Sequence, residues 1–112
     1  MSIGLPVRNG ARFLDEAITS IRAQEFGDFE LIIADNASTD ATEEIARDHA
    51  AADPRISYLR QPRNLGAAAN YNETFRRARG HYFKWAAHDD RLAPGFLGTC
   101  IAALEARPEA VL

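Results

Sequence analysis

Phe29-Glu30-Leu31-Ile32-Ile33-Ala34-Asp35 is the stretch of sequence that decides the fold class. Its centre, residues 31–34, is apolar at every position, whereas Gly27-Asp28 precede it and polar residues follow it. A strand that is apolar at consecutive positions is buried on both faces, which is typical of a parallel sheet covered by helices. The sequence therefore predicts an α/β domain with this strand inside its sheet.

Short apolar segments alternate with helical patterns on both sides of this strand. Strands are expected at residues 2–7, 29–34, 56–59 and 82–86, and a fifth begins at 110–112. The spacing of apolar residues predicts helices around 13–21, from 40 to about 52, over 67–78 and between Pro94 and Pro108. This alternation predicts a three-layer α/β/α domain with a mostly parallel sheet. We expect residues 1–112 to be the N-terminal portion of one truncated domain, because the last strand has only begun.

The periodicity also predicts which side chains are buried. In the helix over 67–78, Ala68, Tyr71, Phe75 and Ala78 share one face. Phe83 and Trp85 are expected in the core, and Cys100 is expected to be a small buried residue beside Phe96 and Ile101.

Composition excludes several classes of protein. The net charge is −3 and the basic residues are scattered, which argues against a nucleic-acid surface. A single cysteine allows neither an internal disulfide nor a thiolate zinc site. No basic, apolar leader and no apolar run of about 18–20 residues is present, so a soluble, cytoplasmic protein without a membrane span is expected.

Three polar loops follow the predicted strands, at residues 6–10, 35–40 and 88–90. The carboxyl ends of parallel strands lie at one edge of a sheet, where ligands bind. Glycine-rich phosphate loops are absent from the sequence, so a bound phosphate would need Arg8, Arg60, Arg63 or a metal ion. The adjacent carboxylates of Asp89 and Asp90 suit a hard ion such as Mg²⁺, which often takes one or two protein carboxylates.

Each of these polar features also has a purely structural interpretation. Asp89-Asp90 could lead into the helix after Pro94, where the dipole favours acids. Asp35 could be a turn residue, and Asp40 with Glu43 fits a capping box. The segment from Asn64 to Asn70 could be only a tight turn and a helix start.

Four motifs occur in order along nearly the whole chain, and together they resemble the family 2 glycosyltransferases. The motifs are Pro6-Val7-x-Asn9-Gly10, Phe29-Glu30-Leu31-Ile32-Ile33-x-Asp35-Asn36-x-Ser38-x-Asp40, Arg63-Asn64-x-Gly66-x-x-x-Asn70 and Asp89-Asp90. The resemblance implies an inverting enzyme with the Rossmann-like nucleotide-diphospho-sugar transferase (GT-A) fold. Its donor would be a nucleoside diphosphate sugar, and its acceptor a hydroxyl of a carbohydrate or lipid-linked molecule, as in polysaccharide biosynthesis.

The resemblance also assigns roles to individual residues. Pro6, Val7 and Arg8 would line the nucleotide base, with Arg8 standing where an aromatic residue often stacks on it. Asp35 would accept a hydrogen bond from the base, which suits uracil or thymine and hence UDP- or dTDP-linked donors. A third wall of the base pocket would come from Arg63, Asn64 and Asn70.

The resemblance further implies a DXD-type metal site. Asp89 and Asp90 would hold Mg²⁺ or Mn²⁺ with the diphosphate, and Asp90 is the better candidate for direct ligation. His88 stands where an aspartate is frequent, and its contact with the metal is left open. In this family the general base lies beyond the position of Leu112, so this chain alone is expected to be inactive.

Two other functions remain open at this point. A nucleotidyltransferase on a similar sheet is one, although Arg8-Asn9-Gly10 is a poor match to its glycine-rich basic loop. The other is a non-catalytic α/β module that forms homo-oligomers through an exposed sheet edge.

Overall fold

Four parallel strands form the sheet in the computed structural model, which describes residues 1–106. The strands are β1 (Ser2–Val7), β2 (Glu30–Asp35), β3 (Ile56–Arg60) and β4 (Phe83–Trp85), in the spatial order β3-β2-β1-β4. The helices are α1 (Ala11–Arg22), α2 (Thr42–Ala52), α3 (Ala67–Arg77) and α4 (Phe96–Ala106). These elements confirm the predicted alternation, while the expected strand at 110–112 lies outside the described residues.

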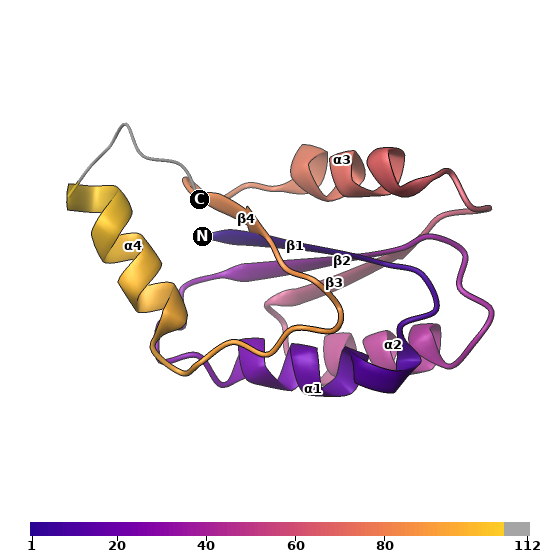
Figure 1. Cartoon of the computed structure of the whole chain (residues 1–112), viewed down its shortest axis with the longest axis horizontal. Coiled ribbons are helices and arrows are strands. Elements are labelled where there is room, and N and C mark those ends of the chain that lie inside the picture. Colours follow the sequence, from indigo (N-terminus) through magenta and orange to yellow (C-terminus); the bar gives the residue numbers. More distant parts are fainter. Residues whose placement is uncertain (107–112) are drawn as a thin grey trace.

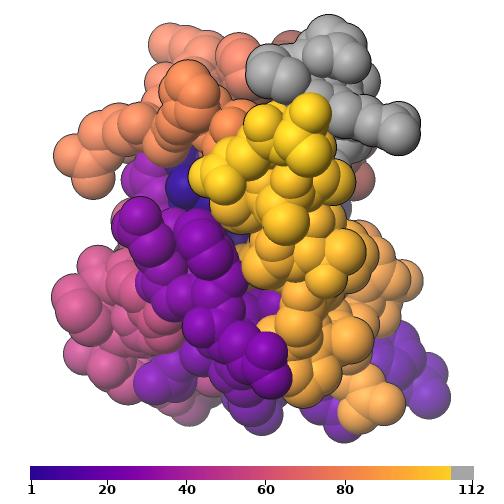
Figure 2. Space-filling model, turned by 90° about the vertical axis from the view of Figure 1, so that its left-hand side faces the viewer, coloured from indigo at the N-terminus to yellow at the C-terminus, as the bar shows by residue number. Residues whose placement is uncertain are grey.

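The helices cover both faces of the sheet, as the three-layer prediction requires. Helices α1 and α2 lie on one face and α3 lies on the other (Figure 1). Helix α4 lies at the end where the strands begin, and Figure 2 looks onto that end of the molecule. Gln24 holds α4 there: its Nε2 donates to the carbonyl of Ala93, and its Oε1 accepts from the Leu97 N–H at 3.0 Å. None of the helices described has the length and apolar character needed to cross a membrane.

Odd- and even-numbered residues of β1 and β2 face opposite layers. The odd positions belong to the main core with α1, which contains Ile3, Leu5, Leu31, Ile33, Leu14, Ile18 and Ile21. The even positions face α3. At Gly4 an added Cβ would collide with the side chains of Thr74 and Phe83, so glycine allows α3 to pack closely on β1.

The prediction of which face of α3 is buried is wrong. Tyr71 and Phe75 are 42% and 58% exposed, whereas Asn70 and Thr74 are buried. Asn70 faces the sheet because its Nδ2 donates to the carbonyl of Ala34 at 2.8 Å. Thr74 fits over Gly4, where a larger side chain would not.

The aromatic residues of β4 are less buried than the sequence predicted. Trp85 is 46% exposed and Phe83 is half-buried, because β4 is the last strand at one edge of the described sheet. Both rings pack edge-on with each other, at 5.3 Å between centroids. Cys100 is half-buried too, since α4 turns Leu97 and Leu104 inward instead.

The predicted capping box at the start of α2 is displaced. The helix begins at Thr42 and its N-cap is Ala41, which makes no side-chain cap. Asp40 nevertheless stabilises the first turn of α2, because its Oδ1 accepts a hydrogen bond from the Thr42 N–H at 3.0 Å. Glu43 pairs with Arg47 one turn later and makes no return bond to Asp40.

Candidate functional site

A pocket of about 400 Å³ opens where β1 and β2 end, beside the first turns of α3. Its walls come from the loops after all four strands. The lining residues are Pro6, Val7, Arg8, Asn36, Asn64, Gly66, Ala67, Asn70, Tyr71 and His88. Five of the residues predicted to bind substrate therefore meet here: Pro6, Val7, Arg8, Asn64 and Asn70.

Arg8 is held beside the pocket by the loop after β2. Its Nη1 donates to the carbonyl oxygens of Asn36 at 2.9 Å and Ala37 at 3.3 Å. The backbone of Ala37 has a φ of +60°, a left-handed conformation that is uncommon for alanine. The two bonds fix the guanidinium, a planar group able to stack on an aromatic ring, at the pocket wall.

The loops after β1 and β2 are tied together by reciprocal hydrogen bonds. The Asn9 N–H donates to Ser38 Oγ at 2.8 Å, and the Thr39 N–H donates to Asn9 Oδ1 at 2.8 Å. Asn9 has a φ of +52°, as suits the turn predicted for Asn9-Gly10. An added Cβ at Gly10 would lie 2.7 Å from the His88 ring, so this glycine allows His88 to approach the pocket.

Asp35 does not line the pocket. Its side chain is fully buried and accepts hydrogen bonds from the Tyr58 hydroxyl at 2.6 Å and the Ser38 N–H at 2.9 Å, with Arg60 at 3.4 Å. Burial, followed by the hydrogen bond to Asp35, raises the pKa of the Tyr58 phenol well above its usual range. In this arrangement Asp35 supports the end of β2, and its predicted contact with a base would need a different side-chain orientation.

Asn36 lines the pocket instead, although the sequence motifs assign it no role. Its side chain bonds to Asn64, Leu65 and Gly66, in the loop after β3. The alternation of side chains along β2 carries the signal that distinguishes the two neighbours. Asp35 continues the face of Leu31 and Ile33 toward α1, so the next residue faces the α3 side, where the pocket lies.

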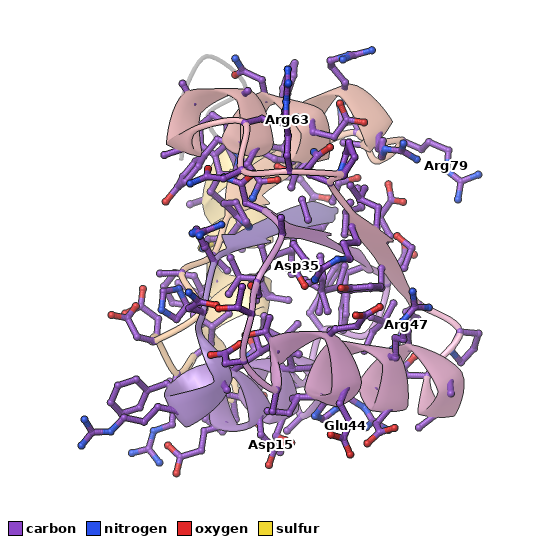
Figure 3. All side chains as sticks on the ribbon, turned by 90° about the vertical axis from the view of Figure 1, so that its right-hand side faces the viewer. Asp15, Asp35, Glu44, Arg47, Arg63 and Arg79 are labelled. Carbon is purple, nitrogen blue, oxygen red and sulfur yellow. The ribbon has the colours of Figure 1, made fainter. Side chains whose placement is uncertain are left out.

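The loop between β3 and α3 supplies the third wall. Gly66 has a φ of +88°, a conformation that favours glycine, and its backbone begins α3. Asn70 is buried, and its Oδ1 accepts from Gln61 Nε2 at 3.3 Å. Arg63 is exposed and is not among the lining residues; Figure 3 shows it at the level of α3, apart from Asp35.

The two predicted metal ligands follow His88 at the pocket's edge. Asp89 and Asp90 are exposed, and neither lines the pocket. Across residues 1–106, His, Cys, Asp and Glu side chains form no group of three that could hold a metal ion. A metal at Asp89 and Asp90 would therefore take most of its ligands from water or a bound phosphate, as a hard ion can. Two accessible carboxylates fit Mg²⁺ or Mn²⁺ in donor type.

Comparison with known proteins identifies the family. The family model described as glycosyl transferase family 2 matches residues 2–112. This chain belongs to glycosyltransferase family 2. The resemblance found in the four sequence motifs is therefore confirmed.

Relatives of this family 2 chain include named glycosyltransferases. It is 36% identical over 94 residues to an uncharacterized glycosyltransferase of Rickettsia typhi, covering 84% of this chain and 28% of that protein. It is 34% identical over 100 residues to a GalNAc(5)-diNAcBac-PP-undecaprenol beta-1,3-glucosyltransferase of Campylobacter jejuni, covering 88% of this chain and 32% of that protein. The chain thus spans about a third or less of these relatives' length.

Solved structures of glycosyltransferases share the fold. S. aureus TarS in complex with UDP matches with a TM-score of 0.87 and 22% identity, over 96% of this chain and 32% of that one. The mannosyltransferase PcManGT from Pyrobaculum calidifontis, in complex with GDP-Man and Mn²⁺, matches with a TM-score of 0.85 and 24% identity, over 92% and 31%. The predicted GT-A fold is confirmed by these likenesses.

Proposed function

We propose that this chain forms the nucleotide-binding part of a glycosyltransferase donor site and takes a nucleoside diphosphate sugar. The observation that carries the proposal is the pocket itself, which the loops after all four strands build at the carboxyl edge of the sheet. This edge is where α/β folds bind nucleotides. Family membership favours transfer of a sugar over transfer of a nucleotidyl group.

The base is proposed to lie between Arg8 and the first turn of α3. The guanidinium of Arg8 would stack on one face of the base, close to the backbone of Pro6 and Val7. Asn36 Oδ1 accepts one hydrogen bond within the protein, so it has a lone pair left for an imide N–H of uracil or thymine. Geometry thus favours Asn36 over Asp35 for this contact. The solved complexes of TarS with UDP and of PcManGT with GDP-Man make UDP and GDP the nucleotides to compare.

Asp89 and Asp90 are proposed to hold a divalent ion beside the diphosphate, with Asp90 as the direct ligand. Mg²⁺ or Mn²⁺ would offset the negative charge of the departing nucleoside diphosphate. In support, His88 packs against Gly10 and lines the pocket, and the two aspartates follow it directly in the sequence. Its own contact with the ion is not part of the proposal.

Transfer would proceed with inversion, as an acceptor hydroxyl attacks the sugar carbon opposite the leaving diphosphate. The general base and the carbohydrate or lipid-linked acceptor are proposed to lie in the part of the relatives that this chain does not span. We therefore expect the chain to bind donor nucleotide without transferring sugar.

Calorimetric titration with UDP, dTDP and GDP, each with and without Mn²⁺, tests this proposal. We expect Mn²⁺-dependent binding, strongest for a uracil or thymine nucleotide. Asp90→Ala should weaken Mn²⁺-dependent binding about tenfold or more, since it removes a charged ligand. The matched control is Asp28→Ala, at an exposed aspartate beside the start of β2, and it should bind like the parent. No binding of any nucleotide would refute the proposed function, and unchanged binding by Asp90→Ala would refute the metal assignment.

A further inference from the structure

Residues 62–69 form a pocket wall that burial alone cannot hold in place. Every residue of this segment is exposed, yet Asn64, Gly66 and Ala67 all line the pocket. Segments with few buried contacts open at low free-energy cost. The position of this wall therefore depends on its hydrogen bonds.

Those hydrogen bonds converge on one side chain, Asn36. Its Oδ1 accepts the Leu65 N–H at 2.8 Å, and its Nδ2 donates to Asn64 Oδ1 at 2.8 Å and to the Gly66 carbonyl at 3.3 Å. In the described part of the chain, no other side chain from outside this segment bonds to residues 62–66. Asn36 is only 4% exposed, so water replaces these bonds poorly.

Asn36 is in turn anchored to the other walls of the pocket. Its backbone N–H donates to the Val7 carbonyl at 2.9 Å, and its carbonyl accepts from Arg8 Nη1 at 2.9 Å. The carboxamide has one possible orientation, since its NH₂ group faces two acceptors and its oxygen faces a donor. Through its backbone and side chain together, Asn36 therefore ties the loops after β1, β2 and β3 into a single unit.

We infer that Asn36 is a positioning residue: its side-chain amide fixes the wall at residues 64–66 and thereby sets the pocket's affinity for its ligand. This inference rests on the proposed function, because it takes the ligand to be a nucleotide. It concerns bonds within the protein, and is separate from any contact between Asn36 and the base.

Two substitutions of Asn36 dissect its role. Asn36→Ala removes all three bonds, so the Leu65 and Gly66 amide protons should exchange faster with solvent, and UDP should bind about tenfold more weakly in Mn²⁺.

Asn36→Asp keeps an acceptor for Leu65 but has no donor for Asn64. Asn64 must then turn its own NH₂ group toward the new carboxylate. This rotation moves Asn64 Oδ1 away from the Gly66 N–H, which donates to it at 3.0 Å in the parent structure. Exchange at Gly66 should accelerate while Leu65 stays protected, and UDP affinity should fall between parent and Asn36→Ala.

Hydrogen exchange read by NMR and UDP titration together decide the outcome. Asn72→Asp, at an exposed position on α3, controls for the added charge and should alter neither amide. Should Asn36→Ala fail to fold, Asn64→Ala gives the same test: exchange at Gly66 rises, and Leu65 keeps its bond to Asn36. Unchanged exchange at Leu65 and Gly66, or faster exchange with unchanged UDP affinity, would overturn the inference. A parent protein that binds no UDP would refute the proposed function instead, while the exchange pattern would still report on the amide.

Discussion

Asp35 is a buried carboxylate whose partners join β2, β3 and the loop that follows β2. It accepts hydrogen bonds from Tyr58 and Ser38, and Arg60 is its cationic neighbour. Removing one partner of such a group leaves a desolvated polar atom without a bond, which costs more than the bond itself contributes. We therefore expect substitutions of Asp35 to lower the free energy of unfolding more than they lower the affinity for a ligand.

Asp35→Ala should lower the free energy of unfolding by about 3 kcal/mol, and Tyr58→Phe by about 1–2 kcal/mol. Urea denaturation followed by circular dichroism measures both, and the double variant should lose less than the sum because the residues are in contact. Tyr82→Phe is the control, since no hydrogen bond of its hydroxyl is found in the described structure. If Asp35→Asn keeps full stability but loses UDP binding, Asp35 contacts the base directly, as the resemblance to the family implies.

The neighbours Asp35 and Asn36 show how far the sequence determines the site. The motifs correctly predicted that Pro6, Val7, Arg8, Asn64 and Asn70 lie together, because parallel strands deliver their loops to one edge. They did not show which of two consecutive polar residues faces the pocket. That choice depends on which sheet face α3 covers, and the packing of Thr74 against Gly4 and the Asn70–Ala34 hydrogen bond show which face it is.

At the scale of elements, the start of α3 depends on the backbone of Gly66. Its φ and ψ of +88° and 157° are strained for any residue with a side chain, although a Cβ there would meet nothing within 4 Å. Gly66→Ala should therefore destabilise the fold by about 1–3 kcal/mol through the backbone alone, measurable by thermal or urea unfolding. Gly98→Ala is the matched control: it also has open space around it, but it lies in α4 and should stabilise by about 0.5–1 kcal/mol. A Gly66→Ala protein as stable as the parent would contradict the role given to this φ.

The junction between α2 and β3 carries a pH-dependent contribution to stability. Hydrogen bonds from Arg55, at 3.0 Å and 2.8 Å, lower the pKa of Asp53 from 3.8 to about 2 against the opposing effect of burial, and Arg22 adds to the lowering. Because the folded pKa is the lower one, this stabilisation is complete above about pH 4 and is lost as the pH falls toward 2. It amounts to at most about 2 kcal/mol.

Urea unfolding between pH 6 and pH 2 tests this assignment. The stability difference between the parent and Asp53→Asn should shrink as the pH falls through that window. Arg55→Gln should remove most of the same pH dependence, because it lacks the charged donor. A difference that stays constant down to pH 2 would show that the ion pair does not depress this pKa.

The helices show a second limit of sequence-based prediction. Apolar spacing located α3 correctly, yet its face toward the sheet is the one that carries Asn70 and Thr74. Hydrophobic periodicity assumes that the largest apolar face is the buried one. Here hydrogen bonding to Ala34 and close packing over Gly4 override that rule, and Tyr71 and Phe75 face outward.

At the scale of the whole molecule, these outward rings join those of β4 in one aromatic cluster, made of the exposed Tyr71, Phe75 and Trp85 and the half-buried Phe83. Neighbouring ring centroids are 5.1–5.7 Å apart. The cluster is carried by α3 and by β4, the edge strand of the described sheet, and its Tyr71 also lines the pocket. Exposed apolar surface beside a sheet edge favours association with another chain.

We therefore expect this chain to self-associate through β4 and the aromatic cluster. Sedimentation velocity over a range of protein concentrations should show a mass that increases with concentration. Phe75→Ser should shift the distribution toward monomer, since Phe75 is the most exposed of these rings at 58%. Phe13→Ser is the matched control: Phe13 is 42% exposed but lies on α1, on the opposite face of the sheet, so its loss should leave association unchanged. A parent protein that is monomeric at every concentration, or an equal effect of both substitutions, would rule out this edge as the interface.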